Sequence, residues 1–231
     1  MENLKYFDFS KQFGENIFAI LTQKDSLIKR MSHEERICFY ANKLNIKRNN
    51  LGIPVQSHSN NCIVIKKYGS YENIDGLITK NKNIVLSISV ADCCPIYIYD
   101  KEMKIRGLIH SGWKGTVNKI CNNAIDKFLK LKSDILNLSI YLGPSIGPCC
   151  YEVENDVAKY FYGHCKTKTI NGKFLVNIRE QIKTDLIEIG INCNQIKISS
   201  VCTLENSKCE SYRRDKKKSG RMIAFFKEIK Y

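Results

Sequence analysis

The amino-acid sequence predicts an α/β fold of the α+β kind, with mixed sheets, and three observations lead to it. The 231 residues fit one domain with a substantial core. The hydrophobic fraction of 43% and the charged fraction of 26% are ordinary for a folded chain. Apolar β-rich runs alternate with segments of helical spacing, and no linker or internal repeat interrupts them. We therefore expect residues 1–231 to form a single domain.

The elements of the first half begin with a helix over residues 32–46. Ser32 stands three residues before Glu35, which is the spacing of a capping box, and apolar residues follow at helical spacing. The run over 83–93 is β-rich and too continuous for a half-exposed edge strand, so it predicts a central strand. The other strands expected in this half cover residues 53–58, 62–68, 96–100 and 104–112.

The second half alternates helices and strands in the same way. Thr116 is a favourable N-cap residue, and the apolar residues after it recur at helical spacing, so we expect a helix over 116–132. Amphipathic patterns predict two further helices, over 153–163 and 177–191. The remaining strands are expected over residues 138–144, 196–203 and 222–229.

The charge and the cysteine content disfavour several classes of protein. The formal net charge of +14 comes from 37 Lys and Arg against 23 Asp and Glu, but the lysines are scattered, which favours a general lysine bias over a nucleic-acid footprint. Eleven cysteines is an odd number, and no C-x-x-C pair occurs, so neither a disulfide framework nor a zinc ribbon is predicted. No apolar run is long enough to span a membrane, and the first residues do not resemble a signal peptide. We expect a cytoplasmic protein.

Three rare polar side chains follow apolar strands, namely His58, Cys93 and His110. Functional groups of α/β proteins gather in loops at strand ends, so neighbouring strands would bring these three together. Two imidazoles and a thiolate suit a catalytic zinc site with one open position, and copper accepts the same donors. A Cys93/His110 nucleophile–base pair is the competing interpretation. Structural roles are the interpretation for the other two histidines, His33 and His164.

Two further segments have the composition of binding loops. Residues 143–153 are rich in glycine and proline between a predicted strand and a predicted helix, as in loops whose backbone N–H groups approach a ligand, and also as in ordinary tight turns. Residues 211–221 contain three arginines, whose forked guanidinium groups suit phosphate or carboxylate, although a solvated basic loop has the same composition.

Six segments, taken in chain order, resemble one family. It is named for polyphenol oxidoreductase laccases and is also described as YfiH-type purine nucleoside phosphorylases and as peptidoglycan editing factors. The segments span residues 56–221 and read QSH (56–58), DGLIT (75–79), ADCCP (91–95), HSGWKG (110–115), GPSIGPCCYEV (143–153) and SYRRDKKKSGR (211–221).

The resemblance implies a layered mixed-sheet sandwich like the YfiH-type fold, which is related to a cysteine-hydrolase toxin domain. It assigns the metal ligands to His58, Cys93 and His110, with zinc expected and copper as the alternative. Cys94 stands where the family commonly has a hydrophobic residue, so we expect it in the core. Lys114 replaces the usual arginine of the H-x-G-W-R-G motif, which keeps the charge and loses the fork.

The resemblance also implies an activity on purine nucleosides. This is phosphorolysis of adenosine, inosine and 5′-methylthioadenosine to base and ribose 1-phosphate, with deamination of adenosine. Asp92 and Tyr151 are candidates for supporting the metal ligands or handling protons, and the candidates for binding substrate or phosphate are Lys114, Arg213, Arg214, Arg221 and Tyr151. Arg30 and Arg36 are the candidates for an N-terminal substrate arginine.

Three alternatives stay open. One is a Cys93/His110 cysteine hydrolase that edits a peptidoglycan precursor. Another is a copper-dependent polyphenol oxidase, which four histidines in the whole chain disfavour. The third is a basic nucleic-acid-binding protein without enzymatic activity.

Overall fold

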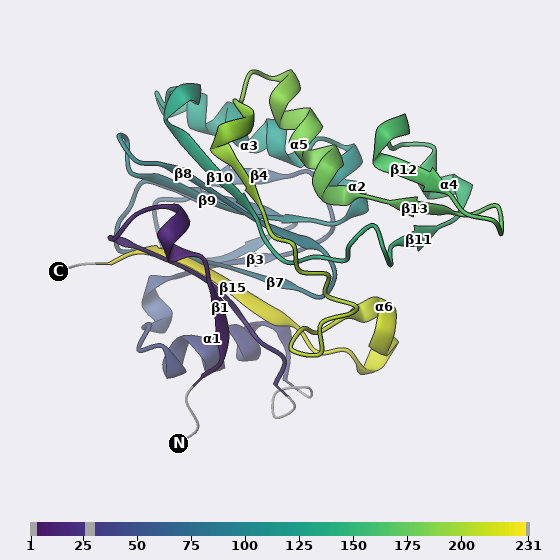
Figure 1. The fold of residues 1–231 in the computed structure, drawn as a ribbon. Coiled ribbons are helices and arrows are strands. Elements are labelled where there is room, and N and C mark those ends of the chain that lie inside the picture. The colour runs from purple at the N-terminus through teal and green to yellow at the C-terminus, as the bar shows by residue number, and fades with distance from the viewer. Residues whose placement is uncertain (1–3, 26–30, 230–231) are drawn as a thin grey trace.

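Two six-stranded sheets lie face to face and are covered on their outer sides by helices, in a computed structural model that describes residues 4–25 and 31–229 (Figure 1). The helix α1 (His33–Lys43) covers the outer face of the first sheet. Two others, α3 (Ile120–Lys130) and α5 (Ile178–Glu188), cover the outer face of the second sheet. The predicted layered sandwich with mixed sheets is confirmed.

The first sheet joins strands from both ends of the chain. In spatial order its strands are β1 (Tyr6–Asp8), β2 (Ile17–Thr22), β15 (Met222–Glu228), β7 (Val85–Val90), β3 (Leu51–Val55) and β5 (Gly69–Glu72). Neighbours are antiparallel as far as β7, whereas β3 runs parallel to both β7 and β5. Every residue of β7 is buried, which is the two-sided burial expected of a central strand.

The second sheet comes mainly from the middle of the chain. Its strands, in spatial order, are β14 (Ile196–Ile198), β10 (Leu138–Leu142), β8 (Cys94–Asp100), β9 (Ile105–Ser111), β6 (Gly76–Thr79) and β4 (Cys62–Val64). The outer pairs β10/β14 and β4/β6 are parallel and the inner pairs are antiparallel. Apolar side chains from both sheets, among them Leu21, Leu86, Ile88, Tyr97 and Leu108, form the core between the two layers.

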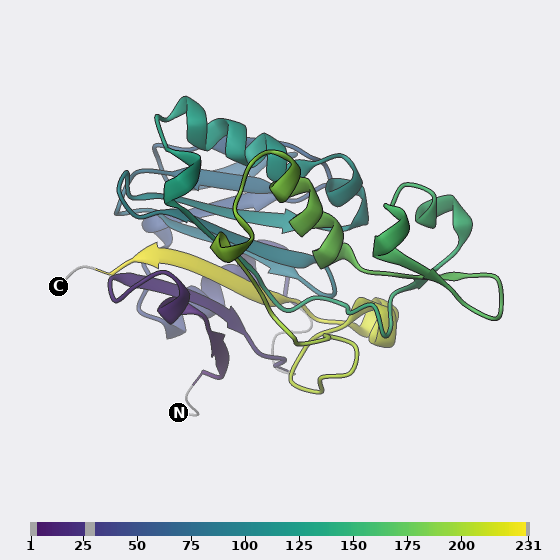
Figure 2. The same cartoon turned by 45° about the horizontal axis from the view of Figure 1, so that its top comes forward.

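A small third sheet projects to one side of the two large ones, as Figure 2 shows. It contains β11 (Glu152–Val153), β13 (Phe174–Val176) and β12 (Lys166–Lys168). The remaining short helices are α2 (Trp113–Val117), α4 (Asn155–Ala158) and α6 (Tyr212–Asp215). Single 3-10 turns cover Ser10–Gln12, Arg48–Asn50, Ile135–Asn137, Gly163–Cys165, Cys193–Gln195 and Lys216–Lys218.

Local sequence signals located most elements but misplaced some ends. The capping box is confirmed, because the Ser32 side chain accepts from the Glu35 N–H and the Glu35 carboxylate accepts from the Ser32 N–H. The Thr116 N-cap is wrong: the helix already begins at Trp113, and the Thr116 hydroxyl donates back to the Gly112 carbonyl at 3.0 Å. The chain then breaks at Lys119, whose φ is 56°, so the expected helix is two helices.

Two elements are shorter than their patterns predict. The expected strand over 196–203 ends at Ile198, because the carbonyls of Ser199 and Val201 accept from the Arg179 guanidinium at 2.6 and 2.9 Å instead of continuing a ladder. The expected helix over 153–163 is a single turn, α4, since Val153 already pairs as a strand residue.

Phe128 of α3 fixes the distance between that helix and the second sheet. Its ring is fully buried, and a methyl group added at Gly107 of β9 would lie 2.9 Å from ring atom Cε2. Phe128→Ala is therefore expected to lower the free energy of unfolding by about 3–5 kcal/mol, through lost burial and the cavity it leaves. Equilibrium urea unfolding measures this loss. The adjacent Leu129 is 43% exposed, so Leu129→Ala should change stability far less.

Candidate metal centre

The structure brings His58, Cys93 and His110 together. His58 follows β3, Cys93 lies between β7 and β8, and His110 belongs to β9. One ligand atom from each of the three side chains lies within 4.8 Å of the other two. The two imidazole rings meet edge to face, with centroids 4.9 Å apart. Strand ends that are far apart in the sequence thus present three donors to one point.

A buried carboxylate, Asp75, orients both histidines. Its Oδ1 lies 2.7 Å from His110 Nδ1 and accepts from the His58 backbone N–H at 3.1 Å. Its Oδ2 accepts from the N–H and the hydroxyl of Ser59, both at 2.7 Å. These bonds hold the 57–59 turn, in which His58 has a φ of 58°. Because Asp75 occupies Nδ1 of His110, Nε2 is the nitrogen left to coordinate.

The electrostatics of the centre favour a thiolate at Cys93. Burial alone would raise its pKa, but the charge of His110 and hydrogen bonds from both imidazoles lower the pKa of Cys93 to about 6. Burial likewise opposes protonation of His110, yet Cys93 and Asp75 raise the pKa of His110 to about 9. For Asp75, burial is outweighed by hydrogen bonds from His110 and Ser59, which lower its pKa.

The neighbouring cysteine has the opposite surroundings. Cys94 begins β8, is fully buried, and packs in the core between the second sheet and its helices. Burial raises the pKa of Cys94 to about 12, so it stays a neutral thiol. Of the adjacent pair, Cys93 faces the two imidazoles and Cys94 fills the core.

The residues present fit a transition-metal ion. A thiolate and two imidazole nitrogens form the type of donor set that zinc and copper accept. A carboxylate behind one histidine is the usual outer partner of such ligands. Three protein ligands leave a further coordination position for a reactant, as catalytic zinc sites do.

Gly112 leaves room for these ligands. A methyl group added there would lie 3.0 Å from Cys93 Sγ and 3.0 Å from His58 Cδ2, while its φ of −81° suits any residue. Gly112→Ala is expected to leave the fold intact and to weaken metal binding about 10-fold or more by displacing a ligand. Competition with a chromophoric chelator measures this. Gly163→Ala, where no atom lies within 4 Å of the added methyl, is the control. Equal affinities for the two variants would contradict the expectation.

A cavity of about 700 Å³ opens beside the three ligands. Aromatic side chains on its wall are Trp113, Tyr151 and Tyr212, and cationic ones are Arg213, Lys216 and Arg221. The Arg213 guanidinium lies 5.2 Å from the centre of the Tyr151 ring and donates to the Glu152 carbonyl. A cavity of this volume with aromatic and cationic walls can accommodate a flat ligand together with an anion.

Some of the predicted binding residues lie on this cavity and others do not. Tyr151, Arg213 and Arg221 line it. Arg214 points away, because its guanidinium donates to the carbonyls of Leu204 and Cys209 and pairs with the carboxylate of Asp215. Lys114 is exposed on α2, its Nζ lies 5.8 Å from the centre of the Trp113 ring, and it is absent from the cavity lining. Arg36 is on α1, and Arg30 lies outside the described residues.

Asp92 lies on the cavity wall, and both oxygens of its carboxylate are hydrogen-bonded. Its φ is 79°, and its carboxylate accepts from the Thr203 hydroxyl at 2.6 Å, the Ser211 hydroxyl at 3.0 Å and the Arg213 N–H at 2.6 Å. Both oxygens are thereby engaged in holding the 203–213 segment over the end of β7. These bonds suit a supporting role for Asp92, one of the two roles expected of it, because the bond from the Arg213 N–H holds that residue at the wall.

Three other residues of the site, Asp75, Gln56 and His33, are not among those that the sequence predicts. Asp75 begins the quoted DGLIT segment, which was the available signal for it. Gln56 lies on the cavity wall and pairs with both backbone groups of Ser89 on β7, at 2.9 and 2.8 Å. His33 also lines the cavity, with its ring nitrogens 3.0 Å from Ser89 Oγ and from the Pro54 carbonyl. Nothing distinguished His33 in the sequence, where it simply begins a helix.

Burial lowers the pKa of His33, so the ring is neutral at neutral pH. The Pro54 carbonyl can only accept, and Nε2 therefore carries the ring proton.

No helix in the described ranges combines the length and the apolar content that a membrane crossing requires.

The chain is similar to several known proteins. Residues 29–227 match the family model described as multi-copper polyphenol oxidoreductase laccase. A Clostridium acetobutylicum protein named purine nucleoside phosphorylase is 34% identical over 191 residues, covering 76% of this chain and 75% of the relative. A protein from an unknown prokaryote named adenosine deaminase is 28% identical over 187 residues, covering 74% and 70%.

Among solved structures, the Bacillus licheniformis hypothetical protein YfiH superposes with a TM-score of 0.83 at 26% identity, covering 93% of each chain. The resemblance of the six motifs is thus confirmed, and the chain belongs to the multi-copper polyphenol oxidoreductase laccase family.

Proposed function

We propose that the chain is a zinc-dependent purine nucleoside phosphorylase. Its substrates would be adenosine, inosine and 5′-methylthioadenosine, and it would also deaminate adenosine. The observation that carries the proposal is the meeting of His58, Cys93 and His110 at the wall of a cavity of about 700 Å³. The names of two relatives, a purine nucleoside phosphorylase and an adenosine deaminase, support the same substrate class.

The cavity has the surfaces that a purine nucleoside requires. Its volume lies within the range of roughly 300–1,000 Å³ that small-molecule sites occupy. Trp113, Tyr151 and Tyr212 offer aromatic surface for the base. Tyr151 is 9% exposed, and burial raises its pKa to about 12. Its phenol therefore remains a neutral hydrogen-bond donor at neutral pH.

Phosphate would be held by the basic side of the same cavity. Arg213 and Arg221 present guanidinium groups there, and Lys216 adds a third positive charge. Forked guanidinium groups suit the oxygens of phosphate better than a lysine does. Of the predicted phosphate ligands we therefore retain Arg213 and Arg221, with Asp92 fixing the position of Arg213 through its backbone N–H.

Zinc is the ion that we propose for the His58, Cys93 and His110 centre. When bound, zinc supplies Lewis acidity, which favours the deprotonated form of an oxygen nucleophile at neutral pH. The two imidazoles and the thiolate would hold the ion, with the thiolate offsetting part of its charge, and Asp75 holds His110 in one tautomer. Copper-dependent phenol oxidation is less favoured, because the whole chain has four histidines and multicopper centres use more.

Product analysis by chromatography tests the proposal. Zinc-loaded protein is incubated with adenosine, inosine or 5′-methylthioadenosine, with and without phosphate. Base release that depends on phosphate is expected for all three nucleosides, and adenosine should also give inosine without phosphate. The absence of both products from protein whose zinc content has been verified would remove the nucleoside assignment.

A second candidate is a cysteine hydrolase of the kind that edits a peptidoglycan precursor. The observation that favours it is the lowered pKa of Cys93 beside His110, which is the pairing of an activated thiolate and a base. Trapping of Cys93 by an electrophile, with amide hydrolysis that survives removal of metal by a chelator, would support this candidate. Loss of activity on chelation and its return with zinc would favour the phosphorylase.

A further inference from the structure

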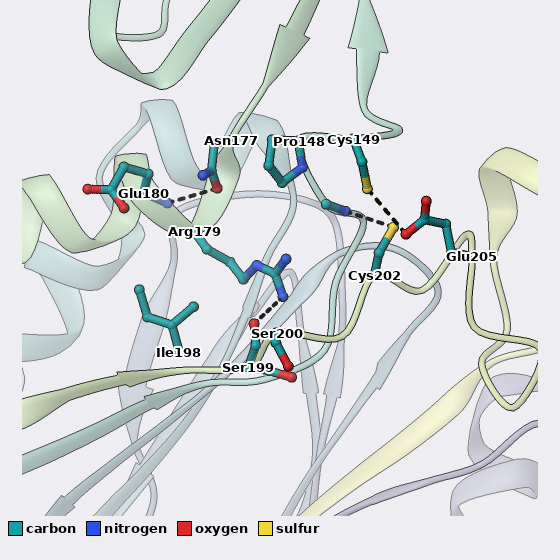
Figure 3. Close-up of a pocket in the computed structure, with 11 residues that line it drawn as sticks. Pro148, Cys149, Asn177, Arg179, Glu180, Ile198, Ser199, Ser200, Cys202 and Glu205 are labelled. Carbon is teal, nitrogen blue, oxygen red and sulfur yellow. Dashed lines mark hydrogen bonds between the residues drawn. The ribbon is translucent and has the colours of Figure 1, made fainter.

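A second cluster of metal-binding side chains lies apart from the centre described above. It contains Cys149, Cys150, Cys202 and Glu205, whose ligand atoms all lie within 4.8 Å of one another. Figure 3 shows Cys149, Cys202 and Glu205 directed toward one another at one end of a separate cavity of about 330 Å³. None of the four lines the cavity beside His58, Cys93 and His110.

The backbone brings two distant loops together at this point. A bridge joins Ser145 to Cys202, and the Thr203 N–H donates to the Ser145 carbonyl at 3.1 Å. The Gly147 N–H donates to Cys202 Sγ at 3.2 Å, which is a contact that stabilises a thiolate. A methyl group at Gly147 would lie 3.1 Å from Cys149 Sγ and 3.2 Å from Cys202 Cβ. A glycine is therefore what lets the two cysteines approach.

The donor set matches a thiophilic ion. Three thiols and one carboxylate are the kind of four ligands that a tetrahedral zinc site accepts. With zinc–sulfur bonds of about 2.3 Å, ligand sulfurs of such a site lie about 3.8 Å apart, within the observed 4.8 Å limit. All three cysteines are free thiols, and Cys149 and Glu205 are exposed, so an ion has access from solvent. Each thiol that binds would release its proton to water.

We propose that Cys149, Cys150, Cys202 and Glu205 bind a second metal ion, of the zinc class. Such an ion would tie residues 147–150 to residues 202–205. Both segments continue into the wall of the large cavity, since Ile146 and Tyr151 line it and Thr203 donates to Asp92. The second ion would thus act as a structural cross-link behind the reacting site, and it does not depend on which reaction that site performs.

Metal counting on the full-length chain tests this proposal. Protein loaded with Zn2+ and passed over a desalting column is analysed for zinc content. Wild type is expected to retain two ions per chain, one for each cluster. Cys93→Ser should retain one, and Cys93→Ser/Cys202→Ser none. Cobalt in place of zinc should give thiolate-to-metal charge-transfer absorption in Cys93→Ser that disappears in the double variant.

Matched variants separate metal binding from misfolding. Cys149→Ser and Glu205→Gln alter exposed side chains, so they should fold while weakening the second ion at least about 10-fold. Cys193→Ser, at an exposed cysteine outside the cluster, should leave zinc content unchanged. Retention of the second ion by both Cys202→Ser and Cys149→Ser would overturn the proposal. A disulfide between Cys149 and Cys202 that persists in reducing buffer, found by peptide mass spectrometry, would also overturn it.

Discussion

Cys93→Ser is expected to lower phosphorolysis by about 10³-fold or more and to remove the ion of the first centre. Serine cannot replace a thiolate whose pKa has been lowered to about 6 by His110 and His58, because its hydroxyl stays protonated. A Lewis-acid ion contributes several kcal/mol to a transition state, and each 1.4 kcal/mol is about tenfold in rate. Initial rates with inosine and phosphate, measured beside zinc content, determine both effects.

The adjacent cysteine supplies the control for this result. Cys94→Ala removes a buried sulfur one residue away, in the core rather than at the centre. It is expected to retain the ion and most of the rate while losing some stability. Wild-type turnover by the Cys93→Ser protein would contradict the assignment of Cys93 as a metal ligand. An equal loss of zinc in Cys94→Ala would show that any substitution in this loop disturbs the centre, and that the effect is not specific to Cys93.

Asp75→Asn is expected to weaken metal binding at the first centre by about 10- to 100-fold. Asparagine keeps the size of the side chain but replaces one acceptor oxygen with a donor, which faces His110 Nδ1 or the Ser59 N–H and hydroxyl. Loss of such an outer carboxylate typically has an effect of this size. Chelator competition measures the affinity, and Asp126→Asn, on the exposed face of α3, is the control.

The same variant has a predicted dependence on pH. Hydrogen bonds from His110 and Ser59, which outweigh burial, lower the pKa of Asp75 below its unfolded value of about 4. Its stabilising contribution is therefore present above about pH 4 and is lost as the pH falls toward the folded-state pKa. Asp75→Asn should lack that part of the acid unfolding, which a series of urea titrations from about pH 6 to about pH 3 would reveal. An unchanged acid dependence would show that Asp75 is not ionised in the folded protein.

The sequence predicted the meeting of the three ligands better than it predicted the local elements around them. His58 and Cys93 each follow an apolar strand and His110 lies at the end of one, β9, and strand ends are where a rigid sheet can present side chains. That signal depends on burial patterns, which are clear in fully buried strands such as β7 and β9. The sequence predicts that the helix after His110 begins at Thr116, because threonine is a favourable N-cap residue. In the structure this helix already begins at Trp113.

The different positions of Arg213 and Arg214 could not be predicted from the sequence. Arg213 and Arg214 are identical in type and adjacent in sequence, yet one lines the cavity and the other bonds carbonyls of its own loop. The difference arises from the one-turn helix α6, which turns successive side chains to different sides. His33 reaches the cavity because α1 packs against distant strands, and no local sequence pattern indicates such a contact.

Two of the three side chains of the first candidate metal centre lie where the chain crosses from one large sheet to the other. His58 stands between β3 and β4, and Cys93 between β7 and β8, so each crossing leads from the first layer into the second. The distances between the donors therefore depend on the distance between the two sheets. Side chains packed between the sheets, among them Leu86, Tyr97 and Leu108, determine that distance. Substitutions in that interior are therefore expected to lower the metal affinity of the first centre without changing any of its residues. A larger distance between the two sheets would move the donors apart and weaken their hold on an ion.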